Sequence, residues 1–269
     1  MHQFDYLSAE QTVHPIRQDI YRHTDGFSLP INVYAPAVAN ENANWAVLCI
    51  HGGGWLSALK KDAPWEADWM RHNARQFASL GYHALEITYR SIGRHDEDVG
   101  VTLADTVSDV RAAMAYIKGT LAPELGFKKI AVIGDSAGGH LALCLALAED
   151  EKLHPDAVVA CNPVSNCVTD ARWHGKLTDA SAQASVSPLH IAKKTKTKML
   201  ILHGTADHVV PFSDSEALFA ALEKAGCTVS LRPLVGTDHA FIIYGYNKNT
   251  AEVSRAMDMA IAFIKSTQY

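Results

Sequence analysis

The chain has 269 residues, of which 48% are hydrophobic and 20% are charged, and its formal net charge at pH 7 is −5. This is ordinary globular composition, and the length suits a single large α/β domain spanning residues 1–269. The negative charge argues against nucleic acid as a partner. No segment reaches the roughly 18 apolar residues that span a bilayer, so we expect no membrane partner.

The amino-terminal sequence MHQFDYLSAEQTVHP has neither the basic nor the apolar part of a secretory signal. The five cysteines are an odd number and form no CxxC pair, which favours buried free thiols in a reducing compartment. We therefore expect a cytoplasmic protein. The 14 histidines form no HExxH motif and no Cys/His cluster, so no metal site is predicted.

Apolar runs and turn residues predict strands that alternate with helices along most of the chain. The expected strands are 17–22, 27–34, 45–50, 82–88, 129–133, 157–161, 198–202 and 228–234. The expected helices are 65–80, 103–118, one beginning at Gly138, 213–225 and 250–266. This order predicts an α/β fold in which a mostly parallel sheet carries helices on both faces.

Residues 162–197 interrupt the alternation with a polar, serine-rich stretch. Because long loops without regular structure are uncommon inside a compact domain, we interpret this stretch as a small lid or cap over a site. A plain surface insertion is the alternative.

The sequence Gly134-Asp135-Ser136-Ala137-Gly138 fits G-x-S-x-G and lies between a predicted strand and a predicted helix. A serine at the apex of such a sharp turn adopts strained backbone angles. The flanking residues approach so closely that side chains would collide, which explains Gly134 and Gly138. The pattern predicts a nucleophilic Ser136 standing above the sheet.

A second glycine-rich motif, His51-Gly52-Gly53-Gly54-Trp55, follows the apolar strand WAVLCI. Consecutive glycines let the backbone approach a ligand and direct its amides toward it. The lysine of a phosphate-binding G-x-x-x-x-G-K-[ST] loop is missing.

Together, the upstream HGGG and the downstream GDSAGG resemble the α/β-hydrolase superfamily, and within it the hormone-sensitive-lipase-like and compact bacterial carboxylesterases. The resemblance covers most of the chain from Tyr34 onward. It implies a triad in the chain order Ser, Asp, His, and no cofactor.

The segment LILHGTADHVVP looks like the strand end that carries the family's acid, which would be Asp207. The segment TDHAF looks like its histidine loop, with His239 as the base. The resemblance implies an oxyanion hole formed by the amides of Gly53, Gly54 and Ala137.

Other residues compete for these roles. His203 precedes the acid and is interpreted as structural, and His208 is expected to point away from the site. Asp214 begins a predicted helix, where a carboxylate is a common cap. Asp238 is interpreted as a loop residue, and Asp135 as a residue that orders the elbow or the glycine loop.

Two features depart from the lipase-like pattern. HGGGW begins already at His51, which leaves little chain for an amino-terminal cap, and His140 stands where many members carry asparagine. Both features look closer to acetyl esterases, including enzymes that deacetylate sugars. They also overlap with kynurenine-formamidase-like hydrolases.

We therefore expect a serine carboxylester hydrolase that acts on small-molecule esters of short, acetyl-like acyl groups. An arylformamidase-like amidase acting on N-formylkynurenine is the alternative, and a non-catalytic ligand-binding member of the fold is a further one. The sequence leaves the alcohol part of the substrate and the oligomeric state open.

Overall fold

The computed structural model describes residues 13–55, 70–92, 100–168, 183–244, 246–247 and 249–267. Its strands are β1 (Arg17–Thr24), β2 (Phe27–Tyr34), β3 (Trp45–Ile50), β4 (His83–Ile87), β5 (Lys129–Asp135), β6 (Ala157–Cys161), β7 (Lys198–Gly204) and β8 (Val229–Leu234). Its α-helices are α2 (Arg71–Ser79), α3 (Leu103–Tyr116), α4 (Ala122–Leu125), α5 (Ala137–Ala146), α8 (Phe212–Lys224) and α9 (Thr250–Ser266). Within these residues, no helix combines the length and apolarity needed to cross a bilayer.

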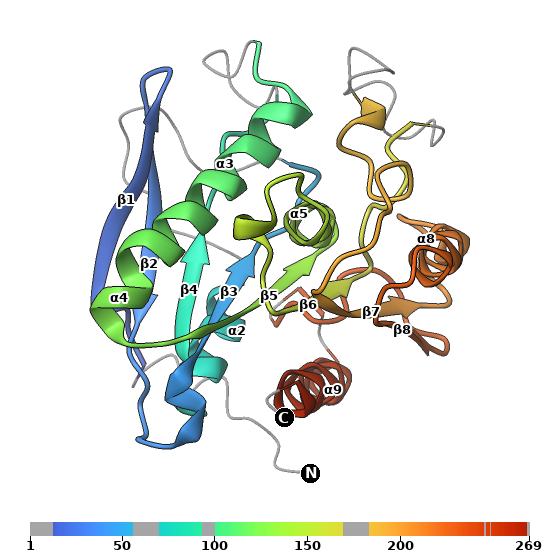
Figure 1. The fold of residues 1–269 in the computed structure, drawn as a ribbon. Coiled ribbons are helices and arrows are strands. Elements are labelled where there is room, and N and C mark those ends of the chain that lie inside the picture. Colours follow the sequence, from blue (N-terminus) through green and yellow to red (C-terminus); the bar gives the residue numbers. More distant parts are fainter. Residues whose placement is uncertain are drawn as a thin grey trace.

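The strands form one eight-stranded sheet in the order β1-β2-β4-β3-β5-β6-β7-β8 (Figure 1). β2 pairs antiparallel with β1 and with β4, whereas every neighbouring pair from β4 to β8 is parallel. The expected mostly parallel sheet is confirmed. Its parallel strands end along one edge, which is where open α/β sheets bind ligands.

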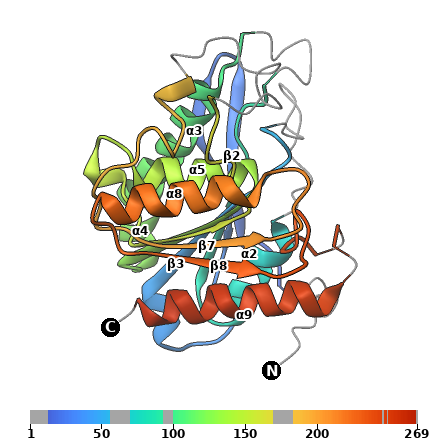
Figure 2. The same cartoon turned by 90° about the vertical axis from the view of Figure 1, so that its right-hand side faces the viewer.

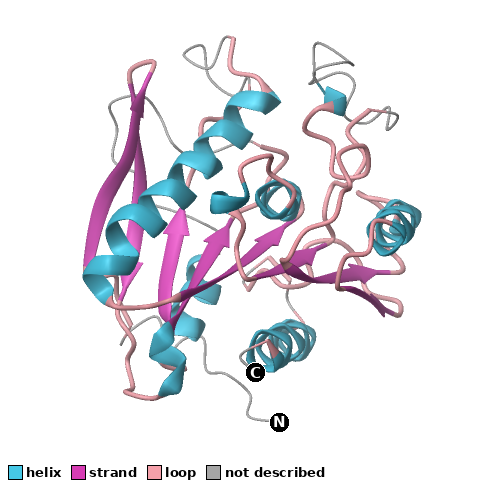
Figure 3. Cartoon of the chain, in the orientation of Figure 1, coloured by secondary structure: helices cyan, strands magenta, loops and turns pink. Residues whose placement is uncertain are grey.

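Helices cover both faces of the sheet (Figures 2 and 3). α3, α5 and α8 bury their apolar residues with one face, and α2 and α9 with the other. The strand β3 is apolar without interruption because both of its faces are buried. Ala46, Leu48 and Ile50 pack into the core cluster on one face of the sheet, and Val47 and Cys49 pack into the cluster on the other face.

Several element boundaries differ from those expected. α2 begins at Arg71, and the expected helical residues 65–69 lie outside the described residues. Gly81 follows α2 with φ +93°, which confirms a C-terminal glycine in the left-handed region.

The helix expected over 103–118 changes form near its end. α3 stops at Tyr116 and continues as a π-helical turn, Ile117–Leu121, and then as α4. Pro123 lacks the amide hydrogen that a regular α-helix would pair with the Gly119 carbonyl. The regular series of backbone hydrogen bonds is therefore interrupted in this region.

All five cysteines are free, and four of them are buried: Cys49, Cys144, Cys161 and Cys167. This agrees with the expectation of buried thiols.

Candidate active site

Four loops that follow carboxyl ends of parallel strands carry the candidate residues. Ser136 follows β5, Asp207 follows β7, and His239 follows β8, while the glycine loop follows β3. Because β3, β5, β6, β7 and β8 are neighbours in that order, these loops share one edge of the sheet. The topology thus gathers side chains that are far apart in the sequence.

Ser136 occupies a strained turn between β5 and α5, with φ 54° and ψ −116°. A Cβ on Gly134 would lie 2.2 Å from the Gly138 carbonyl oxygen, and one on Gly138 would lie 2.1 Å from the Ile50 carbonyl oxygen. Both distances are impossible for real carbon atoms. The prediction that these two glycines permit the turn is therefore confirmed.

The three predicted triad residues meet through hydrogen bonds. His239 Nε2 lies 3.0 Å from Ser136 Oγ, and His239 Nδ1 lies 2.7 Å from Asp207 Oδ2. The Asp207 side chain is fully buried, and that of His239 is 11% exposed. This geometry lets the imidazole accept the serine proton while the carboxylate holds the opposite ring nitrogen.

The Asp207 carboxylate is held from both sides. Its Oδ1 accepts the amides of Val209 and Val210, each at 2.8 Å. Burial opposes its charge, but hydrogen bonds from His203, His239 and the Val210 amide outweigh burial. The pKa of Asp207 therefore lies well below its ordinary value, and this residue stays ionised.

His239 is surrounded by acidic groups. Burial disfavours the imidazolium, but the hydrogen bond to Asp207 and the negative charges of Asp135, Asp207 and Asp238 favour it more strongly. The pKa of His239 is consequently raised above its ordinary value of 6.5. A raised pKa suits a base that must hold a proton during turnover.

Asp238 connects the two loops that carry the acid and the base. Its Oδ1 accepts the His239 amide at 2.7 Å, the His208 amide at 3.3 Å and a ring nitrogen of His208 at 2.7 Å. The expectation that Asp238 is a loop residue is confirmed, and the contacts add that it joins neighbouring loops. His208 points to Asp238 and away from the triad, as expected.

The glycine loop has backbone angles that favour glycine. Gly53 and Gly54 have φ values of 84° and 64°. A Cβ on Gly52 would lie 2.7 Å from the Asp135 carbonyl oxygen and 2.9 Å from its Oδ2. The loop thus packs directly on the elbow, near Ala137, which opens α5 with an amide that has no acceptor in a preceding helical turn.

His51 anchors this loop. Its Nδ1 donates to the Gly52 carbonyl at 2.9 Å, its Nε2 lies 3.1 Å from Thr88 Oγ1, and its ring stacks on Tyr89. Burial lowers the pKa of His51 to about 4. A neutral His51 therefore supports the loop through hydrogen bonds rather than through charge.

Asp135 lies beneath the same loop. Asn162 Nδ2 donates to its Oδ1 at 3.1 Å, and burial raises the pKa of Asp135 to about 6 although the His239 charge opposes this shift. The contacts agree with the role expected for Asp135 in ordering the elbow and the loop.

His140 contributes contacts that were not anticipated. Trp55 Nε1 donates to its Nδ1 at 3.2 Å, and its Nε2 donates to the Val186 carbonyl at 2.7 Å. His140 thus joins the glycine loop to Val186, which lies in the second described part of the 162–197 insertion. Its departure from the asparagine common in the family was the signal in the sequence.

The other two candidates for the roles of acid and base are Asp214 and His203. Asp214 lies in the first turn of α8, but Pro211 occupies the N-cap, so the capping role expected of Asp214 is wrong. With Pro211 at the N-cap, α8 begins at Phe212, one residue before the helix start expected at residue 213. His203, interpreted from the sequence as structural, is fully buried, and its Nε2 lies 3.2 Å from Asp207 Oδ2, a contact that the sequence did not reveal.

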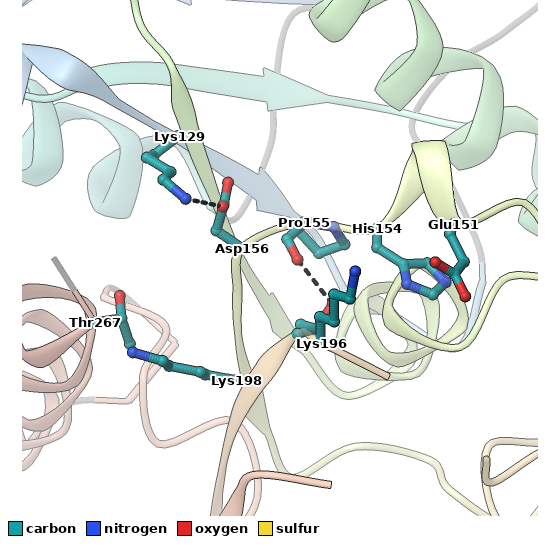
Figure 4. Close-up of a pocket in the computed structure, with 9 residues that line it drawn as sticks. Lys129, Glu151, His154, Pro155, Asp156, Lys196, Lys198 and Thr267 are labelled. Atoms are coloured by element: carbon teal, nitrogen blue, oxygen red, sulfur yellow. Dashed lines mark hydrogen bonds and ion pairs between the residues drawn. The ribbon is translucent and has the colours of Figure 1, made fainter. Parts of the chain in front are cut away.

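A cavity of about 410 Å³ lies elsewhere, at the amino ends of the parallel strands (Figure 4). Its lining includes Lys129 and Lys198, the first residues of β5 and β7, and an ion pair of 2.7 Å joins Lys129 to Asp156. This charged cavity is on the edge of the sheet opposite to Ser136, so we do not assign the chemistry to it. In the described part of the chain, no three His, Cys, Asp or Glu side chains are arranged to hold a metal ion.

The expected lid is described only in part. Residues 162–168 and 183–197 are visible, whereas 169–182 lie outside the described residues. Val164, Cys167 and Val186 pack into the core cluster that also includes the apolar residues of α5.

The fold of this chain is similar to that of known esterases. A thermophilic esterase from Thermogutta terrifontis, solved with propionate bound, matches with a TM-score of 0.77 and 28% identity over 93% of each chain. Another structure of that esterase has butyrate bound. Esterase LipQ of Mycobacterium tuberculosis is 28% identical over 71% of this chain and 49% of its own length.

A mouse relative, inactive dipeptidyl peptidase 10, is 26% identical over 78% of this chain and 27% of its own length. The chain thus spans less than half of each of these two curated relatives. Residues 31–166 match the BD-FAE family model. The chain therefore belongs to the BD-FAE family and is an α/β-hydrolase of the carboxylesterase type.

Proposed function

We propose that this protein hydrolyses esters of short acyl groups through an acyl-enzyme, with Ser136 as nucleophile, His239 as base and Asp207 as acid. The observation that carries the proposal is the continuous contact from Ser136 Oγ through His239 to Asp207, at 3.0 and 2.7 Å. It lies beside a glycine loop in a chain whose structural neighbours are esterases.

In the first step, Ser136 Oγ attacks the ester carbonyl carbon while His239 Nε2 takes the hydroxyl proton. Asp207 keeps the opposite nitrogen, Nδ1, protonated and stabilises the imidazolium that forms. His239 then gives its proton to the leaving alcohol as the carbon–oxygen bond breaks. Water repeats the sequence on the acyl-enzyme and releases the acid.

The negative oxygen of each tetrahedral intermediate requires hydrogen-bond donors. We assign this role to the amides of Gly53, Gly54 and Ala137. The positive φ angles of the two glycines support the assignment, because they turn the backbone in a way that other residues rarely adopt. One such donor is typically worth about 3 kcal/mol of activation free energy.

The direct test measures hydrolysis of p-nitrophenyl acetate, acetylated sugars and N-formylkynurenine by the purified protein. We expect ester hydrolysis to exceed formamide hydrolysis. A preference for N-formylkynurenine would instead identify an amidase that uses the same residues, and inactivity on the whole panel would favour a non-catalytic member of the fold.

Short acyl groups are favoured by two observations. In the described part of the insertion, the apolar residues Val164, Cys167 and Val186 are buried in the core cluster that includes the residues of α5. The Thermogutta terrifontis esterase has been solved with propionate and with butyrate, which are short acyl acids. We infer that the acyl-binding site is shallow rather than a deep tunnel.

Acyl-chain preference follows as a prediction. Acetyl to butyryl p-nitrophenyl esters should give the highest kcat/KM, with a steep fall beyond about eight carbons, because methylenes that stay in water gain none of the roughly 0.8 kcal/mol available on burial. A maximum at decanoate or longer would reveal an apolar channel and contradict the inference.

The pH dependence of the reaction also follows. The protonated His239 cannot accept the Ser136 proton, so kcat/KM should be low in acid and rise as pH passes through the raised pKa, with a midpoint above the ordinary 6.5. Asp135→Asn removes one of the charges that favour the imidazolium and should move the midpoint to lower pH. Asp258→Asn on α9 is the matched control and should leave it unchanged. An unmoved midpoint in Asp135→Asn would show that Asp135 does not act on His239.

A further inference from the structure

We propose that His203 is a positioning residue of the catalytic acid, a second imidazole that donates to the same Asp207 oxygen as His239, which is Oδ2. The inference rests on the proposed triad and adds a residue to it. His203 is the sixth residue of β7 and precedes Asp207 by four residues in the sequence.

The contacts of His203 fix which nitrogen carries the proton. Its Nε2 lies 3.2 Å from Asp207 Oδ2 and 3.1 Å from the Val210 carbonyl oxygen. Both neighbours are acceptors, so Nε2 must be the donor. Its Nδ1 lies 2.7 Å from Ser215 Oγ, whose hydroxyl can donate to it.

The environment holds this ring rigidly. His203 and Ser215 are both fully buried, and Phe212 packs edge-on against the ring at 5.7 Å between centroids. Ser215 and Phe212 belong to the first turn of α8, whereas Asp207 and Val210 belong to the loop that precedes it. His203 thus ties the acid loop to the helix that follows it.

The consequence for Asp207 is a shared oxygen. Oδ2 faces His239 at 2.7 Å and His203 at 3.2 Å, while Oδ1 is occupied by two backbone amides. Because both oxygens of the Asp207 carboxylate have hydrogen-bonding partners, the carboxylate is held in the orientation that contacts His239. The His203 N–H dipole also places positive charge near His239, which disfavours the imidazolium.

Removing His203 should therefore have two separate effects. The carboxylate loses one of its supports, so kcat should fall by about 10- to 100-fold, a cost typical of small misplacements of a catalytic group, while KM changes little. The midpoint of the pH profile should also rise, because Asp207 then acts more strongly on His239. The other charged groups facing His239, which are Asp135 and Asp238, remain in place.

The experiment compares wild type, His203→Leu and His203→Gln in kcat, KM and pH profile with p-nitrophenyl acetate. His203→Gln retains an amide donor and should recover part of the rate and return the midpoint toward wild type. His83→Leu, on β4, is the matched control, since it removes a histidine that packs against Phe127 far from Asp207. It should change neither kcat nor the midpoint.

A folded His203→Leu protein with wild-type kcat and midpoint would overturn the proposal, as would a loss of rate without any shift of the midpoint. If His203→Leu does not fold, ¹⁵N spectra of wild-type histidines decide. The Nε2–H signal of His203, identified by its absence from His203→Gln, should shift in Asp207→Asn, and an Nε2 that is unprotonated or unaffected by Asp207→Asn overturns the proposal. Failure of the proposed function would be recognised separately, because wild type itself would then be inactive or Ser136→Ala would remain active.

Discussion

Ser136→Ala is expected to abolish hydrolysis of p-nitrophenyl acetate, with a loss in kcat on the order of 10⁴ or more. The hydroxyl that would form the acyl-enzyme is absent, and neither His239 nor the glycine loop can replace it. Alanine can occupy the same turn, because the tight contacts there fall on Gly134 and Gly138. Circular dichroism and thermal unfolding should therefore resemble those of wild type.

Covalent labelling provides an independent measurement of the same assignment. An organophosphate ester should add one phosphoryl group to wild type and none to Ser136→Ala, as measured by intact-protein mass. Ser79→Ala is the matched control, since Ser79 only donates to the Gln76 carbonyl at the end of α2. A folded Ser136→Ala protein that still turned over ester and accepted the label would refute the assignment of the nucleophile.

Most of the fold could be predicted because local signals agreed with the tertiary structure. β6 and α9 have the bounds expected from their sequences. The sequence of α9 is amphipathic, and Asn249 caps its first turn by accepting the Glu252 amide. The π-helical turn after Tyr116 could not be predicted, because it depends on how the chain accommodates Pro123 while α3 stays packed on the sheet.

The residues of the candidate site were predictable to different degrees. Ser136 and the glycine loop carry short patterns whose backbone requirements are visible in the sequence. Asp207 and His239 came from the resemblance, and the sheet order explains why they meet.

The contacts of His203 and His140 were not predictable, since their partners are backbone carbonyls and side chains from other elements: Val210 and Ser215 for His203, and Trp55 and Val186 for His140. No spacing rule in a single sequence reports such contacts. They become visible only when the loops are brought together.

Asp207→Asn is expected to reduce kcat/KM by about 10³- to 10⁴-fold. Asn cannot place its NH2 group at the Oδ1 position, because the amides of Val209 and Val210 already donate there at 2.8 Å. The NH2 group must then face His239, whose Nδ1 would have to accept, while the His203 N–H keeps only the Val210 carbonyl as its acceptor. A proton forced onto Nε2 leaves His239 unable to take the proton of Ser136, so the variant folds but fails in the first step.

Asp214→Asn is the matched control, an aspartate in the same region with the same chemical change, in the first turn of α8. Its kcat/KM should remain within about twofold of wild type, since surface changes away from the reacting groups rarely matter more. Steady-state kinetics with p-nitrophenyl acetate on both variants decides the matter. If Asp214→Asn lost activity and Asp207→Asn kept it, Asp214 would be the acid. The contact of 2.7 Å between His239 and Asp207 would then have no catalytic role.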